Sequence, residues 1–484
     1  MKISKLILGG FKGIKSKATI PLAPITLLFG ANSTGKSSIL HGLLYLHEIL
    51  VNKNLDPQYS ALTGNNVFLG GFSNIVHSKD VNNSITIGFE LDLNGSESPI
   101  DNYSSEAELW LIENAFAPFV DIECDTWACE LEIAWSSLEK RVYIKKLETF
   151  FNGQNFGQIN YNPGSPGAII SKLKLIEGMG EFLLNSPVIE DSDNGLPWDG
   201  IALNGQKNAL PDINKRFDFS LIADELTHYY EENPLAGKTW FEASASQALL
   251  GPIKLFAHKL KSMLHIGPLR IVPKFDYTDA PLNDGWFNGK GAWDHFINTH
   301  ESMKSYINEF FDSPEFLNTN YQFDVAIDEI GRKMPFVKDI ESDIELSMSE
   351  LGVGFSQLFP IVVSALDEKF SIVSAEQPEL HIHPKWQLLL ADLYLLAVEG
   401  HPDRLFLVET HSEHLMLRLL KRRMQTADDE LPSGKSPCYK DTVQIVFCEK
   451  EGKQTRILPI STTDEGEFDA AWPNGFFNER IGEL

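Results

Sequence analysis

A phosphate-binding loop near the N-terminus carries the strongest chemical signal in the sequence. Residues 30–37 read GANSTGKS, a complete GxxxxGK[ST] pattern. In this pattern, main-chain N–H groups at the N-terminus of a helix cradle phosphate oxygens. We expect Lys36 to pair with the β- and γ-phosphates and the Ser37 hydroxyl to hold Mg²⁺. The residues predicted to bind nucleotide in this loop are Gly30, Asn32, Ser33, Thr34, Gly35, Lys36, Ser37 and Ser38.

An acid at the end of another strand must help such a loop to hold the metal ion. Residues 370–376 read FSIVSAE, so Glu376 is the predicted metal-holding acid beside Ser37. The next residues read QPELHIHP and offer Gln377 or Glu379 for positioning water. An acid after an apolar strand is also typical of a helix cap, and it is the phosphate loop that favours the metal role.

Two further segments have the composition of phosphate contacts. Residues 347–357, SMSELGVGFSQ, place small residues before an apolar helix, whose N-terminal N–H groups suit a γ-phosphate. Residues 405–412, LFLVETHS, end a strand with His411, which can hydrogen-bond a γ-phosphate. Taken singly, glycines before a helix are common and a lone histidine is more often structural.

Taken in chain order, GANSTGKS, SELGVGFSQ, AEQPELHIHP and LVETHSEHL resemble the nucleotide-binding core of the ABC-type ATPases. The resemblance is to the soluble RecF-like and OLD-like group, and the run WPNGFF at 472–477 is similar to the C-terminal end of one branch of it. It implies ATP and Mg²⁺ as ligands. It also implies two composite sites in a head-to-tail dimer or higher oligomer, closed by Ser349, Gly352 and Gly354 of the neighbouring subunit.

The resemblance gives a set of catalytic candidates, and one of them departs from the pattern. The candidates are Glu376, Gln377, Glu379, Glu409 and His411. ABC-type ATPases usually carry two acids after the metal-binding strand, the second of which polarises water, and here that position holds Gln377. Glutamine cannot accept a proton as a carboxylate does. Either Glu379 or Glu409 takes this role, or hydrolysis is slow and the ATP-bound dimer is long-lived.

The elements that must position these residues alternate between strands and helices. Apolar stretches predict strands at 25–29, 370–375 and 405–408, and at the start of 264–277, where Arg270 follows the strand. Helical spacing predicts helices at 37–51, 355–365 and 386–398. The order predicts an α/β fold, an ABC-type ATPase core with a mostly parallel sheet, to which an antiparallel β lobe and an inserted helical region are added.

The middle of the chain has different patterns. We predict antiparallel strands at 84–93, 106–112, 129–135 and 142–147, polar connections at 153–167 and 191–208, and helices at 169–184 and 241–264. Three parts follow from this reading. They are the N-terminal part of the core at 1–150, an inserted and largely helical region at 151–262, and the C-terminal part of the core at 263–484.

Composition limits the partners and the location. Among 484 residues, Lys plus Arg total 41 and Asp plus Glu total 67, which gives a net charge of −26 that disfavours nonspecific nucleic-acid binding. A local contact at residues 421–423, KRR, stays open, although short charge runs are usually solvated. Four cysteines without CxxC pairs are read as reduced thiols, and no signal peptide or long apolar run is found. We expect a cytoplasmic protein without a membrane segment.

The histidines admit a competing reading as a metal site. His381, His383, His411 and His414, with Glu379, have HxH and HxxH spacings that occur in such sites. The resemblance instead assigns these residues to the subunit interface and the γ-phosphate, and we favour that assignment.

The predicted function is an ATP-dependent switch. We see no appended nuclease, whereas OLD-like proteins that carry their own nuclease extend further beyond the last motif. Members of the group without one often work in bacterial antiphage systems, such as Septu-like or PARIS-like systems, where the ATPase assembles with a nuclease partner. We therefore expect a separate nuclease effector and a phage-derived trigger. The alternatives are a RecF-like DNA-repair ATPase that clamps DNA and an ATP-bound scaffold with little turnover.

Overall fold

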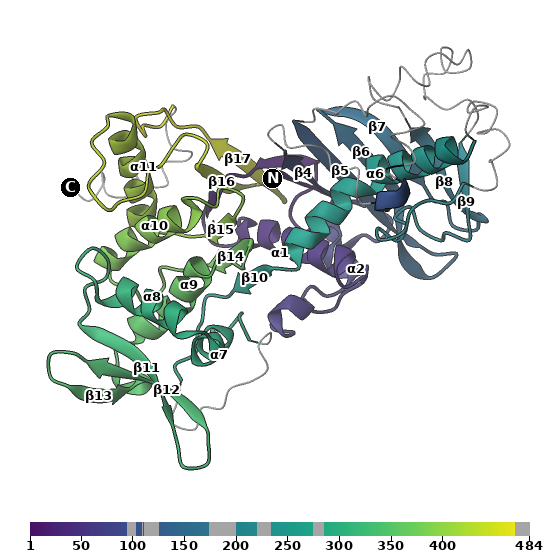
Figure 1. Ribbon diagram of the computed structural model, residues 1–484. Coiled ribbons are helices and arrows are strands. Elements are labelled where there is room, and N and C mark those ends of the chain that lie inside the picture. The colour runs from purple at the N-terminus through teal and green to yellow at the C-terminus, as the bar shows by residue number, and fades with distance from the viewer. Residues whose placement is uncertain are drawn as a thin grey trace. The chain divides into compact units, whose positions relative to one another are not determined.

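The computed structural model describes residues 1–93, 103–108, 110, 125–173, 200–219, 234–273 and 285–469 (Figure 1). The chain divides into two compact units. The first comprises Met1–Thr19, Ile49–Asp56 and Gly71–His258, and the second comprises Ile20–Glu48, Pro57–Gly70 and Lys259–Leu484. The domain boundary expected between residues 262 and 263 is close to Lys259, where the last segment of the second unit begins. The boundary expected between residues 150 and 151 falls inside the strand Arg141–Phe151.

A six-stranded sheet forms the centre of the second unit. Its order is β10 (Met263–Ile266), β14 (Ile372–Glu376), β15 (Leu405–Glu409), β3 (Ile25–Phe29), β16 (Val443–Glu451) and β17 (Gln454–Ile460). Neighbouring strands are parallel from β10 to β16, and β17 pairs antiparallel with β16. All five residues of β3 and of β15 are buried, as expected of strands covered on both faces. The predicted mixed α/β fold with a mostly parallel sheet is confirmed.

Helices and a small sheet complete this unit. The helices are α1 (Lys36–Leu50), α7 (Lys290–Asn298), α8 (Glu301–Asp312), α9 (Val353–Leu366), α10 (Pro384–Val398) and α11 (Glu413–Ala427), with short turns η1 (Ala61–Thr63) and η5 (Met348–Glu350). The small sheet consists of β11 (Tyr321–Ile327), β12 (Lys333–Asp339) and β13 (Ile344–Ser347). In the core, the rings of Trp293 and Phe359 stack 3.7 Å apart and join α7 to α9. The helices predicted around the motifs are confirmed.

An eight-stranded sheet forms most of the first unit. Its order is β2 (Ala18–Pro21), β1 (Lys2–Gly9), β4 (Ile85–Asp92), β5 (Thr126–Ser136), β6 (Arg141–Phe151), β7 (Gln154–Asn160), β8 (Gly167–Leu173) and β9 (Ile201–Asn204). The pairs from β1 to β9 are antiparallel. Short helices α2 (Phe72–Ile75) and η2 (His77–Lys79) precede β4.

A long helix, α6 (Pro234–Leu260), packs against the eight-stranded sheet (Figure 1). The rings of Phe89 on β4 and Phe256 on α6 stack at 3.9 Å. A Cβ on Gly157 of β7 would lie 2.4 Å from Leu249 Cδ2 of α6, so glycine at this position gives the Leu249 side chain room against the sheet.

Several expectations for the middle of the chain are wrong. Residues 167–173, at the start of the helix predicted at 169–184, form strand β8, because a short apolar run fits a strand as well as a helix. The polar connection predicted at 153–167 contains β7, in which Phe156 and Ile159 are buried between solvent-facing polar residues. Residues 106–108, predicted to start a strand, are helical. The region at 151–262 thus contributes three strands as well as α6.

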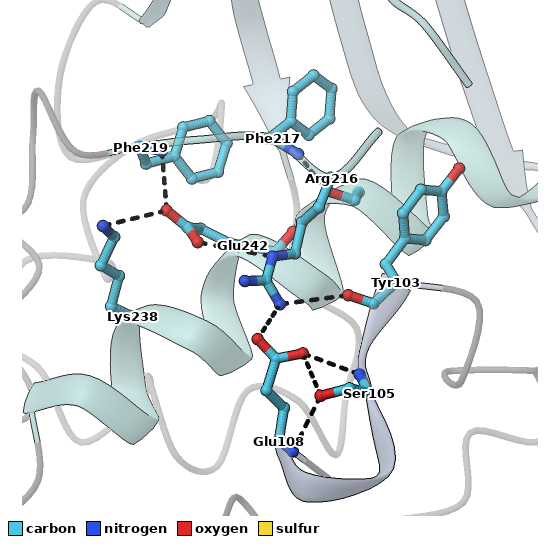
Figure 2. A network of polar contacts seen from close by, with 9 residues as sticks. Tyr103, Ser105, Glu108, Arg216, Phe217, Phe219, Lys238 and Glu242 are labelled. Atoms are coloured by element: carbon cyan, nitrogen blue, oxygen red, sulfur yellow. Dashed lines mark hydrogen bonds and ion pairs between the residues drawn. The ribbon is translucent and has the colours of Figure 1, made fainter. Parts of the chain in front are cut away.

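Parts of the middle region lie outside the described residues, namely 109, 111–112, 174–184 and 191–199. In the described part, Glu242 of α6 holds the end of the segment 200–219 through Arg216 and Phe219 (Figure 2). One Glu242 oxygen accepts the Phe219 N–H at 2.9 Å, and the other lies 3.7 Å from Arg216 Nε. Arg216 also donates to Glu108 at 2.8 Å. No helix in the described ranges is long and apolar enough to cross a bilayer.

Candidate nucleotide-binding site

The phosphate loop connects β3 to α1 and depends on two glycines. Gly30 has φ +142° and Gly35 has φ +107°, values that L side chains rarely adopt. A Cβ on Gly30 would also lie 2.2 Å from the Cys448 carbonyl oxygen. The loop is braced from within, because Thr34 Oγ1 donates to the Ala31 carbonyl at 2.8 Å. Helix α1 has no acid in its first turn, so its positive end is free to face an anion.

The Lys36 ammonium is held over this loop and is almost fully buried. Its Nζ donates to the carbonyls of Gly30 at 2.9 Å and Ala31 at 3.0 Å, and the side chain is 3% exposed. Nζ also lies 3.7 Å from Glu409 Oε1. A buried ammonium needs anionic or carbonyl partners, and a phosphate would be a stronger partner than these carbonyls.

Glu409, at the end of β15, is the carboxylate that meets the phosphate loop. Ser37 Oγ donates to Glu409 Oε2 at 2.8 Å. The predicted metal-holding pair was Ser37 with Glu376. Glu376 ends the next strand, in register with Glu409, and its Oε1 lies 3.3 Å from Nε2 of the fully buried His265.

The surroundings of Glu409 disfavour the ionised form of its carboxyl group. Burial raises the pKa of its carboxyl group, and the neighbouring Glu376 and Glu379 raise it further. The Ser37 hydroxyl and the Lys36 ammonium lower the pKa and partly oppose this effect. A carboxylate with this balance is suited to a cation, because added positive charge would stabilise its ionised form.

The turn after β14 brings Gln377 and Glu379 to the same strand ends. Gln377 has φ +45°, a left-handed conformation that costs a non-glycine residue roughly 1–2 kcal/mol. Its N–H donates to the Glu409 carbonyl at 2.7 Å. Glu379 Oε1 accepts the His411 N–H at 2.7 Å, while its buried Oε2 has no hydrogen-bond partner among the described residues. Burial raises the pKa of Glu379.

His411 follows β15 and has an available ring nitrogen. Within the described part of the chain, its buried Nε2 has no hydrogen-bond partner. Burial lowers the pKa of His411, and the Lys36 charge lowers it further, so the neutral ring is favoured. Ser412, the next residue, caps α11 by accepting the Leu415 N–H at 3.0 Å.

Ser349, Gly352 and Gly354 lie together just before and at the start of α9. Ser347 and Glu350 form a capping box around η5, and the Ser347 and Ser349 hydroxyls lie 2.8 Å apart. Gly352 is the N-cap of α9, and a Cβ there would meet no atom within 4 Å. A Cβ on Gly354 would lie 3.1 Å from the His381 carbonyl oxygen.

Sequence reasoning gave no role to three buried polar residues of this site, His265, Arg270 and Gln357. Arg270 follows β10 and donates to the carbonyls of Glu376 and Gln377. Its position after a strand that ends in Gly-Pro was visible, but its partners are 106 and 107 residues away in sequence. Only the folded sheet brings them together.

Two competing readings of the sequence receive no support. Among the described residues, no three His, Cys, Asp or Glu side chains form a group that could hold a metal ion. In the run at 421–423, Arg422 forms a buried bidentate pair with Asp392 at 2.8 and 3.0 Å. Arg423 is 2% exposed and donates to carbonyls such as that of Lys440. These two arginines stabilise the fold and do not form a nucleic-acid surface.

The fold and this site define a phosphate-loop nucleotide-binding protein. Residues 1–162 match the family described as AAA ATPase domain, and this range contains the phosphate loop and α1. The match supports an ATPase with an AAA-type domain in the first third of the chain. No curated protein matches the chain in sequence.

Similar solved structures are SMC head domains. One is an SmcHead bound to the C-winged helix domain of ScpA, with a TM-score of 0.41 and 13% identity over 95% of this chain and 98% of that chain. Another, from Thermotoga maritima, has a TM-score of 0.38 and 10% identity over 96% and 100%. A third, an Smc head with an extended coiled coil bound to the C-terminal domain of ScpA from Pyrococcus furiosus, has a TM-score of 0.40 and 11% identity over 95% and 96%. Likenesses of this size transfer no function.

Proposed function

We propose that the chain binds ATP with Mg²⁺ and hydrolyses it. The observation that carries the proposal is the meeting of Lys36 and Ser37 with Glu409 at the carboxyl ends of the central strands β3 and β15. An ammonium, a hydroxyl and a carboxylate at the N-terminus of a helix are the groups that hold a nucleoside triphosphate and its metal ion. Nearby, His411 Nε2 is available for a phosphate oxygen.

Each residue would have a distinct task in this site. Lys36 would exchange the carbonyls of Gly30 and Ala31 for phosphate oxygens, and Ser37 and Glu409 would hold the metal ion, with Glu376 as a second carboxylate. Bound Mg²⁺ would neutralise charge on the β- and γ-phosphate oxygens. His411 would hold a γ-phosphate oxygen. Gln377 would orient the attacking water, and Glu379 is one candidate to accept its proton.

The composite site is a further part of the proposal. Ser349, Gly352 and Gly354 would close over the nucleotide of a second subunit in a head-to-tail dimer or higher oligomer. The open space at Gly352 supports this, because a phosphate or a partner chain can approach its backbone. The N-terminus of α9 would then face the γ-phosphate of the partner's nucleotide.

The biological role that we propose is an ABC-type switch of the RecF-like and OLD-like group, which controls a separate nuclease in antiphage defence. Its support is the resemblance of the four motifs. A phage-derived trigger and a cytoplasmic location belong to the same proposal. The buried, unpaired thiols of Cys129, Cys438 and Cys448 are in keeping with a reducing compartment. Copurification of a nuclease with the tagged protein tests the effector.

A second candidate function is an ATP-bound scaffold with little turnover. The observation that favours it is Gln377, which stands where a proton-accepting carboxylate is usual in the resembling family. If the protein binds ATP tightly but hydrolyses it slowly, this result would favour the ATP-bound scaffold over the ATP-hydrolysing switch.

Labelled ATP binding tests the primary function, with Lys36→Ala as the probe. The variant loses the ammonium that faces the phosphates, so its affinity for ATP should fall at least about tenfold. Lys259→Ala is the matched control, because Lys259 is also a buried lysine of this unit. Its ammonium pairs with the Asp403 carboxylate at 2.9 Å and does not contact the phosphate loop. Equal binding by wild type and Lys36→Ala would show that the phosphate-loop assignment is wrong.

A further inference from the structure

The Arg270 guanidinium joins three segments of the unit that contains the six-stranded sheet. Arg270 follows β10 and is 5% exposed. Its NH2 donates to the carbonyls of Glu376 at 2.9 Å and Gln377 at 3.2 Å, and its NH1 donates to the Gln357 carbonyl at 3.2 Å. The guanidinium therefore connects the turn after β14 with helix α9.

The Gln357 side chain hydrogen-bonds the main chain of Arg270. Its amide oxygen accepts the Arg270 N–H at 3.2 Å, and its Nε2 donates to the Arg270 carbonyl at 2.6 Å. Gln357 is itself 3% exposed and lies one turn into α9, four residues after Val353. Side chain and main chain of both residues are thus used in one closed set of hydrogen bonds.

Burial of the Arg270 guanidinium costs desolvation free energy, and an apolar side chain would pack here without that cost. A buried guanidinium loses its hydration, and burial lowers the pKa of Arg270 to about 10, which leaves it charged at neutral pH. Its acceptors are main-chain carbonyls, and its Nε has no hydrogen-bond partner among the described residues. One of those carbonyls belongs to Gln377, whose left-handed φ of +45° must be held by its surroundings.

We propose that Arg270 is a positioning residue which, locked by Gln357, holds Gln377 at the end of β14 and ties this turn to the start of α9. The inference rests on the proposed ATPase function. Its consequence is that the residues around a subunit's own nucleotide and the Gly352 end of α9, offered to the partner's nucleotide, move as one body. ATP bound to one subunit would thereby set the geometry that this subunit presents to the next.

Arg404 provides a matched control. It is likewise a buried arginine, 4% exposed, of the same unit, and it too donates to main-chain carbonyls, including those of Phe370 at 3.0 Å and Ala365 at 2.8 Å. These carbonyls lie at the other end of α9 and before β14, away from Gln377. Arg404→Lys should therefore reproduce the loss of buried hydrogen bonds without touching the turn.

The test compares wild type, Arg270→Lys, Gln357→Leu and Arg404→Lys. For each protein, we would measure ATP affinity, kcat and KM, the melting temperature, and hydrogen–deuterium exchange across residues 353–366 with and without ATP. Arg270→Lys and Gln357→Leu should keep ATP affinity and KM within about threefold and lose about tenfold or more in kcat. They should also lose the ATP-induced change in exchange that wild type shows. Gln357→Leu, which keeps the guanidinium, serves if Arg270→Lys does not fold.

The control decides between positioning and packing. Arg404→Lys should lower the melting temperature as much as the other variants yet keep kcat and the ATP-induced change. An equal loss of kcat in Arg404→Lys would overturn the inference, as would wild-type kcat in both test variants or no ATP-induced change in wild type. A wild type that binds no ATP would instead defeat the proposed function itself, and this result is distinguishable because it needs no variant.

Discussion

Ser37 Oγ donates a 2.8 Å hydrogen bond to Glu409 Oε2, although 372 residues separate the two in sequence. The bond exists because β15 and β3 are parallel neighbours, with Glu409 in register with Leu28. The loop that follows β3 then turns Ser37 back over the end of β15. The hydroxyl predicted to hold Mg²⁺ therefore already has a carboxylate beside it.

The first prediction concerns this carboxylate. Glu409→Gln keeps the shape of the side chain and its ability to accept the Ser37 hydrogen bond, but it removes the negative charge. Affinity for ATP in the presence of Mg²⁺ should fall about 10–100-fold, while affinity measured with EDTA should change little. Titration of a fluorescent ATP analogue with and without Mg²⁺ measures both quantities.

Glu376→Gln is the matched comparison, because Glu376 occupies the equivalent position on the adjacent strand. A loss of ATP affinity that appears only with Mg²⁺ and only in Glu376→Gln would support the assignment of the metal ion to Glu376 that was made from sequence. Losses in both variants would mean that the two carboxylates act together.

The second prediction concerns Gly352. This residue has φ −58°, and a Cβ there would meet no atom within 4 Å, so Gly352→Trp should not strain the subunit. If Gly352 faces a partner's nucleotide, the bulky side chain should block closure. ATP binding should then be retained while turnover falls at least about tenfold. Steady-state ATPase assays and ATP-dependent self-association in solution measure these outcomes, and full activity in the variant would rule out the composite site.

The central strands and the phosphate loop could be predicted from sequence because their signals are local. The fully buried run 25–29, followed by GANSTGKS and a helical apolar pattern, has one common interpretation. The turn at Gln377 and the N-terminus of α9 were likewise located by motif. In each case the sequence signal lies within about one strand or helix length, although some of the contacts that these residues make do not.

The partners of Glu409 and Arg270 could not be predicted, because they depend on strand order and register. Glu376 and Glu409 both end apolar strands, and nothing local to either indicates which one lies beside β3. The same limit explains β8, where the helix predicted at 169–184 begins: a short apolar run does not indicate by itself that it pairs with β7 and β9. Arg270 resembles any exposed arginine after a strand until α9 covers it.

The third prediction uses the buried carboxyl of Glu379. Burial raises its pKa above the ordinary value of 4.5, so the folded state binds more protons than the unfolded state over the interval between the two values. The stability that this group contributes is therefore full below pH 4.5 and is lost as the pH rises through the folded pKa. Glutamine has no such loss and can still accept the His411 N–H.

Glu379→Gln should consequently melt about 1–3 °C above wild type at pH 8, with the difference disappearing toward pH 4.5. Thermal unfolding across this pH range, without nucleotide, measures the effect. A difference that is constant with pH would show that Glu379 does not titrate with a raised pKa.

The last prediction concerns the water-polarising group. If Gln377 occupies that position and no other acid replaces it, wild type should hydrolyse ATP slowly, and Gln377→Glu should accelerate it. The reason is that a carboxylate can accept the proton that glutamine cannot, and a general base is typically worth about 10²–10⁴-fold. The hydrogen bonds that hold this turn are made by the main chain of Gln377 to Glu409 and Arg270, so the substitution should leave its backbone in place.

If Glu379 or Glu409 accepts the proton instead, Gln377→Glu should change the rate little. Glu379→Gln or Glu409→Gln should then abolish turnover, and for Glu379 this should occur with ATP still bound, because its carboxyl bonds the His411 N–H and not the loop. We expect the slow wild type, since the Glu409 oxygens already meet Lys36 and Ser37 and one Glu379 oxygen already accepts the His411 N–H. Single-turnover and steady-state assays of the three variants separate these outcomes. A fast wild-type rate that none of the substitutions alters would place the catalytic group outside these segments.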